Sequence, residues 1–146
     1  MAEIRIEPAA PCDIGAFCGL LRASKLLTED IDAAHLDGFL MARQATEIVG
    51  GVGVEPYGDV GLLRSLVVAD SARDRGLGGR LMAAAEEHAA ALGIRRLYLL
   101  TTTAGAYFEA RAYQITARAD APAAIASTSQ FSGLCPSSSI FMSKTL

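Results

Sequence analysis

A short glycine-rich stretch, RDRGLGG (Arg73–Gly79), combines the residue types that bind a phosphate group. Its arginines supply positive charge, and its glycines carry no side chain that would keep a ligand away from backbone N–H groups. The apolar run Leu66–Val68 precedes it, and an amphipathic pattern follows it. The first turn of a helix has unpaired N–H groups and about half a positive charge. The stretch therefore predicts a phosphate site, most simply for a diphosphate, where a strand leads into a helix.

Two other phosphate motifs fit this stretch less well. A P-loop needs G-x-x-x-x-G-K-[ST], which the chain lacks, and the dinucleotide fingerprint needs G-x-G-x-x-G, whereas Gly78 is followed by GRL. The alternative to a phosphate site is a plain turn with solvated arginines. The combination of strand, arginines, glycines and amphipathic helix favours the binding site.

Two charged residues beside apolar runs are candidates for substrate binding and for catalysis. Arg64 lies within LLRSLVV, where an unpaired charge is costly. It needs either a bound carboxylate, phosphinate or arsinate, or an ion pair inside the chain with Asp59 or Glu55. Glu55 follows the buried run IVGGVGV at a strand end and is the candidate general base, the alternative being a solvated carboxylate.

Tyrosines and cysteines give weaker indications. The tyrosines either line a pocket or pack in the core, and they are Tyr57, Tyr98, Tyr107 and Tyr113. Three cysteines without a C-x-x-C pair disfavour a disulfide framework and a metal site, and they are Cys12, Cys18 and Cys135. We therefore expect reduced thiols, no metal and a cytoplasmic location.

The hydrophobic patterns predict a mixed order of strands and helices. Strands are expected at 3–9, 39–43, 47–58, 60–69, 95–103, 114–117 and 138–144. Helices are expected at 13–23, 76–92, 105–113 and 121–131, with a turn and short helix at 26–38. Asp13 is the expected N-cap of the first helix. The order indicates one α/β (α+β) domain over residues 1–146, with a βαβ unit near 62–100.

Composition excludes several classes of protein. The chain has 146 residues, of which 51% are hydrophobic, and a formal net charge of −3. A weakly acidic chain without a basic run is a poor nucleic-acid binder. No apolar run is long enough for a membrane span, and MAEIRIEPAAP lacks the apolar segment of a secretory signal.

Three segments resemble the GNAT family of N-acetyltransferases. RDRGLG (Arg73–Gly78) matches the family motif Q/R-x-x-G-x-G/A, SLVV lies where the cofactor-contacting strand ends, and YFEARAY (Tyr107–Tyr113) is similar to the late F-Y-x-x-x-G-F segment. The order of elements also fits over nearly the whole chain. The resemblance implies the GNAT fold, a central mixed, mostly antiparallel and twisted sheet of about six or seven strands with helices on both faces.

The resemblance also implies acetyl-coenzyme A as the cofactor. The backbone of Leu66, Val67 and Val68 would pair with the pantetheine arm, as a peptide pairs with an open strand edge. The pyrophosphate would be surrounded by Arg73, Asp74, Arg75, Gly76, Leu77, Gly78 and Gly79. A backbone N–H at the end of the 62–68 strand would stabilise the oxyanion. The expected reaction is direct attack of a primary amine on the thioester in a ternary complex.

The sequence departs from the family where the acid is expected. Many relatives use the tyrosine of the F-Y pair, whose position holds Phe108, and others use a glutamate, whose position holds Leu100. The catalytic candidates are therefore Glu55 and Tyr107, with Arg64 and Tyr57 as substrate-binding candidates.

A finer resemblance concerns the acetyl acceptor. VGVEPYGDVGLLRSLVV, RRLYLLTTTA and LCPSSS are similar to the arsenic-resistance N-acetyltransferase subgroup. This implies a small anionic, amino-acid-like acceptor such as arsinothricin or phosphinothricin. The alternatives are a non-catalytic acetyl-coenzyme A-binding regulator and a protein or peptide N-acetyltransferase. Family members often pair, so a homodimer is also expected.

Overall fold

The computed structural model describes residues 3–26, 28, 31, 38–73, 75–128, 130–134 and 139–146. The strands are β1 (Ile4–Pro8), β2 (Phe39–Gln44), β3 (Glu47–Tyr57), β4 (Val60–Val68), β5 (Arg96–Thr101), β6 (Gln114–Ile115) and β7 (Ile140–Thr145). The helices are α1 (Ile14–Ala23), α2 (Leu77–Ala91), α3 (Gly105–Glu109) and α4 (Ala123–Ala126). Short helical turns occur at η1 (Pro11–Asp13), η3 (Asp70–Ala72), η4 (Arg118–Asp120) and η5 (Gln130–Leu134).

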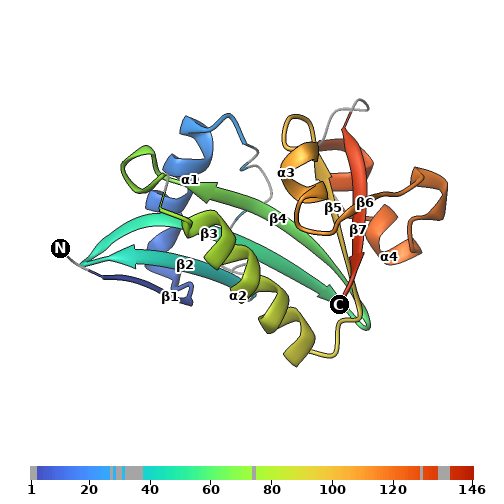
Figure 1. The fold of residues 1–146 in the computed structure, drawn as a ribbon, viewed down its shortest axis with the longest axis horizontal. Helices are drawn as coiled ribbons and strands as arrows, with labels where there is room; N and C mark the ends of the chain where they lie inside the picture. The colour runs from blue at the N-terminus through green and yellow to red at the C-terminus, as the bar shows by residue number, and fades with distance from the viewer. Residues whose placement is uncertain are drawn as a thin grey trace. The chain divides into compact units, whose positions relative to one another are not determined.

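The strands follow the hydrogen-bonding order β1-β2-β3-β4-β5-β7-β6 (Figure 1). β1 with β2, β2 with β3, β5 with β7 and β6 with β7 are antiparallel. β4 runs parallel to β5, with Val60–Leu62 opposite Arg96–Tyr98. The mixed, mostly antiparallel sheet expected from the sequence is confirmed. The chain divides into two compact units, unit 1 (1–55 and 63–88) and unit 2 (56–62 and 89–146).

In unit 1, β3 is packed from both faces. A Cβ on Gly50 would meet the Val67 carbonyl oxygen at 2.8 Å and Leu81 Cδ1, from α2, at 3.2 Å. A Cβ on Gly51 would meet Cε1 of Phe17, from α1, at 2.6 Å. Neighbouring residues of a strand face opposite sides of the sheet, so α1 and α2 cover opposite faces of β3.

In unit 2, aromatic side chains fill the core between β5, β7 and the segment that contains α4. Tyr98 stacks on Phe141 with ring centroids 5.4 Å apart, and Phe131 meets the same ring edge-on at 5.2 Å. Ile125 of α4 is fully buried in this cluster. These contacts bury apolar area that an isolated four-residue helix could not bury alone.

Two expected helices are shorter than predicted. The helix expected at 105–113 ends at Glu109, and Ala112 has a φ of 74°, a left-handed conformation that a helix cannot continue. Of the helix expected at 121–131, only α4 and the start of η5 are helical. Just after α4, the hydroxyls of Ser127 and Thr128 donate to the carbonyls of Ala123 and Ile125, which competes with continuation of a helix. The strand expected at 114–117 is limited to β6, and most of the segment expected at 26–38 lies outside the described residues.

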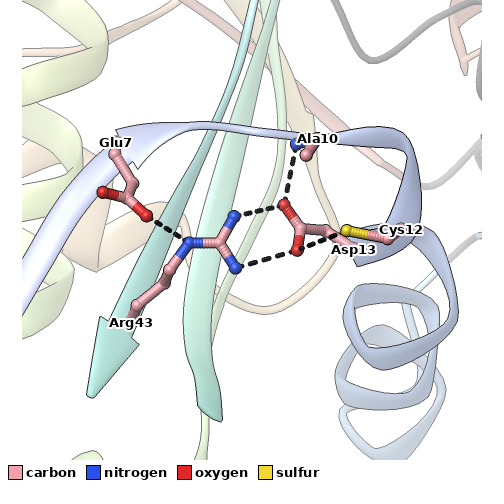
Figure 2. Close-up of polar contacts among 5 residues, drawn as sticks. All are labelled: Glu7, Ala10, Cys12, Asp13 and Arg43. Atoms are coloured by element: carbon pink, nitrogen blue, oxygen red, sulfur yellow. Dashed lines mark hydrogen bonds and ion pairs between the residues drawn. The ribbon is translucent and has the colours of Figure 1, made fainter. Parts of the chain in front are cut away.

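Asp13 is the N-cap residue of α1, as predicted, but its side chain makes no capping hydrogen bond to the helix. Its Oδ2 instead accepts the Ala10 N–H at 2.7 Å, and its Oδ1 accepts Arg43 Nη1 at 2.8 Å (Figure 2). Arg43 also donates from Nε to Glu7. The hydrogen bond from Arg43 holds the pKa of Asp13 below its usual value, and the same bond raises the pKa of Arg43.

Candidate functional site

The described register of β4 with β5 ends before β4 itself does. β4 continues to Val68, but the described parallel register with β5 covers only Val60–Leu62. Ser65, inside the strand, has a φ of 61°, in the left-handed region. The segment Leu66–Val68 therefore follows an irregular residue, beyond the described register with β5.

An arginine binds the end of this strand. Arg73 donates from Nε to the Val68 carbonyl at 3.3 Å and forms an ion pair from Nη1 to Asp70 Oδ1 at 3.1 Å. Both side chains of the ion pair are exposed, so it contributes little to stability. Arg75 is also exposed. The turn after β4 thus presents two cationic side chains to solvent, while Asp74 lies outside the described residues.

The turn leads directly into the N-terminus of α2. The Gly76 carbonyl accepts the Arg80 N–H at 3.1 Å, so Gly76 caps the helix, and its φ of 72° suits glycine. Leu77 is buried and anchors the first turn, whereas Gly78 and Gly79 are half-buried. At the N-terminus of a helix, backbone N–H groups point outward along the helix axis. Helix dipole, glycines and arginines coincide in unit 1, an arrangement suited to a phosphate.

Glu55 and Arg64 are brought together by β3 and β4. Arg64 Nη1 lies 2.9 Å from Glu55 Oε2, and Arg64 Nε donates to Ser65 Oγ at 3.0 Å. The Arg64 side chain is 2% exposed and that of Glu55 is 24% exposed. The guanidinium also lies 5.9 Å from the centroid of the Phe39 ring. Of the alternatives for Arg64, the ion pair inside the chain is present.

Tyr57 and Tyr107 belong to unit 2 and are both partly exposed. Tyr107 on α3 meets Phe108 edge-on at 5.3 Å, and the Arg111 guanidinium lies 6.0 Å from the centroid of the Tyr107 ring. Phe108, where the resemblance places the tyrosine of many relatives, is buried against Tyr113. Phe108 is therefore a packing residue and carries no hydroxyl for acid catalysis.

The structure also bears on the cysteines, on groups of metal ligands and on membrane-spanning helices. Cys12 is exposed and Cys18 is buried, both as free thiols, whereas Cys135 lies outside the described residues. Within the described ranges, no three His, Cys, Asp or Glu side chains cluster in a way that could hold a metal. Over the same ranges, no helix has the length and apolar character needed to cross a membrane.

Sequence reasoning did not single out Ser65. Its left-handed φ in the middle of a strand is visible only in the structure. The one available signal was the adjacent polar pair Arg64–Ser65 within an otherwise apolar strand.

The chain is similar to known proteins in sequence and in structure. Residues 15–114 match the Acetyltransferase (GNAT) family. The chain is 29% identical over 90 residues to an amino-acid acetyltransferase of Neisseria meningitidis. The aligned residues cover 60% of this chain and 21% of that protein. The chain therefore spans about a fifth of the length of this curated relative.

Solved structures share the fold. The N-acetylglutamate synthase from Neisseria gonorrhoeae in complex with coenzyme A and N-acetyl-glutamate superimposes with a TM-score of 0.87 at 25% identity, over 100% of this chain and 36% of that one. Rv2747 from Mycobacterium tuberculosis, in complex with CoA and NLQ, gives a TM-score of 0.82 at 17% identity, over 97% of this chain and 99% of that one. The family match covers more than half of the chain. The protein belongs to the Acetyltransferase (GNAT) family.

Proposed function

We propose that this chain is an acetyl-coenzyme A-dependent N-acetyltransferase that acetylates the primary amine of a small, anionic, amino-acid-like molecule. The observation that carries the proposal is the junction of β4 with α2, where Arg73 bonds the Val68 carbonyl and Gly76 caps the helix. Membership of the GNAT family and likeness to a synthase bound to coenzyme A support the choice of cofactor.

The proposed cofactor site lies entirely within unit 1. The backbone of Leu66, Val67 and Val68 would pair with the amides of the pantetheine arm. The N-terminus of α2 and its glycines would receive the diphosphate, and Arg73 and Arg75 would neutralise its charge. Asp74, Leu77 and Gly79 complete the proposed set.

In the proposed reaction, the amine first loses a proton to Glu55, because an ammonium has no lone pair. The amine then attacks the thioester carbonyl, a C–N bond forms, and a backbone N–H near the end of β4 stabilises the oxyanion. As the C–S bond breaks, the nitrogen loses its second proton to water, and the thiolate takes up a proton either from Tyr107, which is then reprotonated from solvent, or from water directly. A thiol has a pKa near 8.5, so the thiolate leaves with little assistance.

The acceptor is proposed from chemistry and likeness together. The Neisseria meningitidis relative is named an amino-acid acetyltransferase, and the Neisseria gonorrhoeae structure is that of an N-acetylglutamate synthase. We propose that Tyr57 borders the acceptor and that an acidic amino acid is its simplest form. Arsinothricin and phosphinothricin share an amino group, a carboxylate and a second anionic group, so they belong in the same panel. A cytoplasmic location and a homodimer also remain proposals.

Release of free thiol from acetyl-coenzyme A tests the proposal. Purified protein is assayed with glutamate, aspartate, neutral amino acids, phosphinothricin, arsinothricin and a lysine-containing peptide. We expect thiol release with one or more anionic amino acids, a mass gain of one acetyl group on the amine, and little reaction with the peptide.

Other outcomes separate the alternatives. Tight acetyl-coenzyme A binding without turnover on any amine would support the regulatory alternative, which the buried Phe108 favours. Reaction with the peptide alone would identify a peptide acetyltransferase. Absence of coenzyme A binding by calorimetry would overturn the proposal.

A further inference from the structure

The interior of β4 contains a residue in a conformation that strands do not normally adopt. Ser65 has a φ of 61°, and non-glycine residues in this region are disfavoured by contact between Cβ and the backbone. Ser65 follows the last described β4–β5 pair, Leu62 with Tyr98, by three residues and directly precedes Leu66. A left-handed residue inside a strand bends it and changes the direction of the N–H and C=O groups that follow.

The side chain of Arg64 is bonded to this irregular residue. Successive side chains of a regular strand point to opposite faces, so Arg64 and Ser65 would not ordinarily meet. Here Arg64 Nε donates to Ser65 Oγ at 3.0 Å. The left-handed φ and this hydrogen bond are therefore two parts of one local structure.

Two further contacts fix the guanidinium. Nη1 donates to Glu55 Oε2 on β3 at 2.9 Å, and the group lies 5.9 Å from the centroid of the Phe39 ring on β2. The side chain of Arg64 is 2% exposed. A planar guanidinium with several fixed donors can hold two partners in a set geometry, which an ammonium group cannot.

We infer that Arg64 is a positioning residue that holds Ser65 in its left-handed conformation and thereby sets the direction of the backbone that receives the pantetheine arm. The inference rests on the proposed function, because it assumes that Leu66–Val68 binds coenzyme A. It assigns Arg64 to the cofactor strand, whereas the sequence suggested contact with the anionic acceptor.

The experiment compares variants at both residues by calorimetric titration with coenzyme A. Arg64→Gln removes the guanidinium that bonds Ser65. We expect the affinity for coenzyme A to fall about tenfold, since left-handed backbone is disfavoured by roughly that factor in non-glycine residues. Ser65→Gly should bind as the wild type does, because glycine adopts this φ without help. Arg64→Gln combined with Ser65→Gly should recover most of the lost affinity.

A second comparison leaves Arg64 intact, so it applies even if Arg64→Gln fails to fold. Ser65→Ala loses the Oγ acceptor but keeps the backbone preference against left-handed φ, so it should bind coenzyme A more weakly than Ser65→Gly. Arg22→Gln, an exposed arginine on α1, is the matched control for loss of one positive charge and should leave affinity unchanged.

Three results would overturn the inference. One is wild-type affinity for coenzyme A in folded Arg64→Gln, and another is equal affinity in Ser65→Ala and Ser65→Gly. The third is a raised KM for the amine alone in Arg64→Gln, with no rescue by Ser65→Gly, which would assign Arg64 to the acceptor. If the wild type itself does not bind coenzyme A, the proposed function fails first, so the two failures are distinguishable.

Discussion

At the scale of single residues, two arginines of unit 1 each hold a carboxylate, but in different surroundings. Arg43 binds both oxygens of Asp13, whose side chain is 5% exposed, and also bonds Glu7. Arg64 bonds Glu55, whose side chain is 24% exposed. The carboxylate of Asp13 is buried and bound at both oxygens, as expected of a structural contact, whereas the carboxylate of Glu55 is partly accessible to solvent.

The first residue-scale prediction concerns Asp13 and acid stability. Arg43 lowers the pKa of Asp13 in the folded protein, so the stabilisation is fully present above the ordinary aspartate pKa of about 3.9. This stabilisation is lost as the pH falls through the lowered pKa that Asp13 has in the folded protein. Asp13→Asn should therefore reduce the free energy of unfolding by ~2–3 kcal/mol at pH 7, measured by urea denaturation. The difference from the wild type should shrink below about pH 4.

An exposed ion pair supplies the control. Asp70→Asn breaks the pair with Arg73, whose members are 92% and 54% exposed, and should leave the free energy of unfolding unchanged within error. The interpretation of Asp13 would fail if the wild type and Asp13→Asn lost stability in parallel as the pH fell from 7 to 3.

At the scale of elements, the glycines of β3 set how closely the helices approach the sheet. Gly50 admits α2, and Gly51 admits Phe17 of α1. Phe39 of β2 covers Gly53, where a Cβ would meet the ring at 2.5 Å. The sequence EIVGGVGVEPY therefore encodes a strand whose small residues are contact points for neighbouring side chains.

A substitution at Gly50 tests this packing. The added Cβ of Gly50→Ala would lie 2.8 Å from the Val67 carbonyl oxygen and 3.2 Å from Leu81 Cδ1, so the backbone must shift. We expect the free energy of unfolding to fall by ~1–3 kcal/mol in urea denaturation.

The matched substitution is Gly19→Ala on α1, where a Cβ meets nothing within 4 Å. Alanine favours a helix over glycine by up to ~1 kcal/mol, so this variant should be as stable as the wild type or more so. Equal stability of the Gly50→Ala and Gly19→Ala variants would show that β3 does not control the approach of α2.

The sequence predicted most elements of the sheet because their signals are local. Alternating or continuous apolar runs identified β1 to β5 and β7, and the amphipathic period identified α2 to within a residue at each end. The start of α2 at Gly76 could be predicted because a glycine directly before an amphipathic period is a local signal. For Arg64, the sequence left open an ion pair with Asp59 or Glu55, and the structure has the pair with Glu55. The contact of Asp13 with Arg43 could not be predicted, because it depends on which segments become neighbours in the fold.

At the scale of the whole molecule, the two compact units carry different groups. The proposed cofactor site lies in unit 1, whereas all four tyrosines of this tryptophan-free chain belong to unit 2. Tyrosine emission therefore reports unfolding of unit 2, while far-ultraviolet circular dichroism also reports α1 and most of α2 in unit 1. The domain expected over residues 1–146 can be tested with these two signals.

We expect both signals to show one thermal transition at the same midpoint, since a chain of this size usually unfolds cooperatively. Coenzyme A at about 100 times its Kd should stabilise the folded state by about 2.7 kcal/mol and raise both midpoints equally, by roughly 5–10 °C. The tyrosine midpoint is decisive, because a ligand bound only to unit 1 can raise it only if unit 2 unfolds together with unit 1. A rise confined to the dichroism signal would show that the units unfold independently and would contradict a single domain. Pantetheine, which keeps the thiol and the arm of coenzyme A but lacks the diphosphate, is the control for the phosphate site at the same concentration and should shift neither midpoint as far.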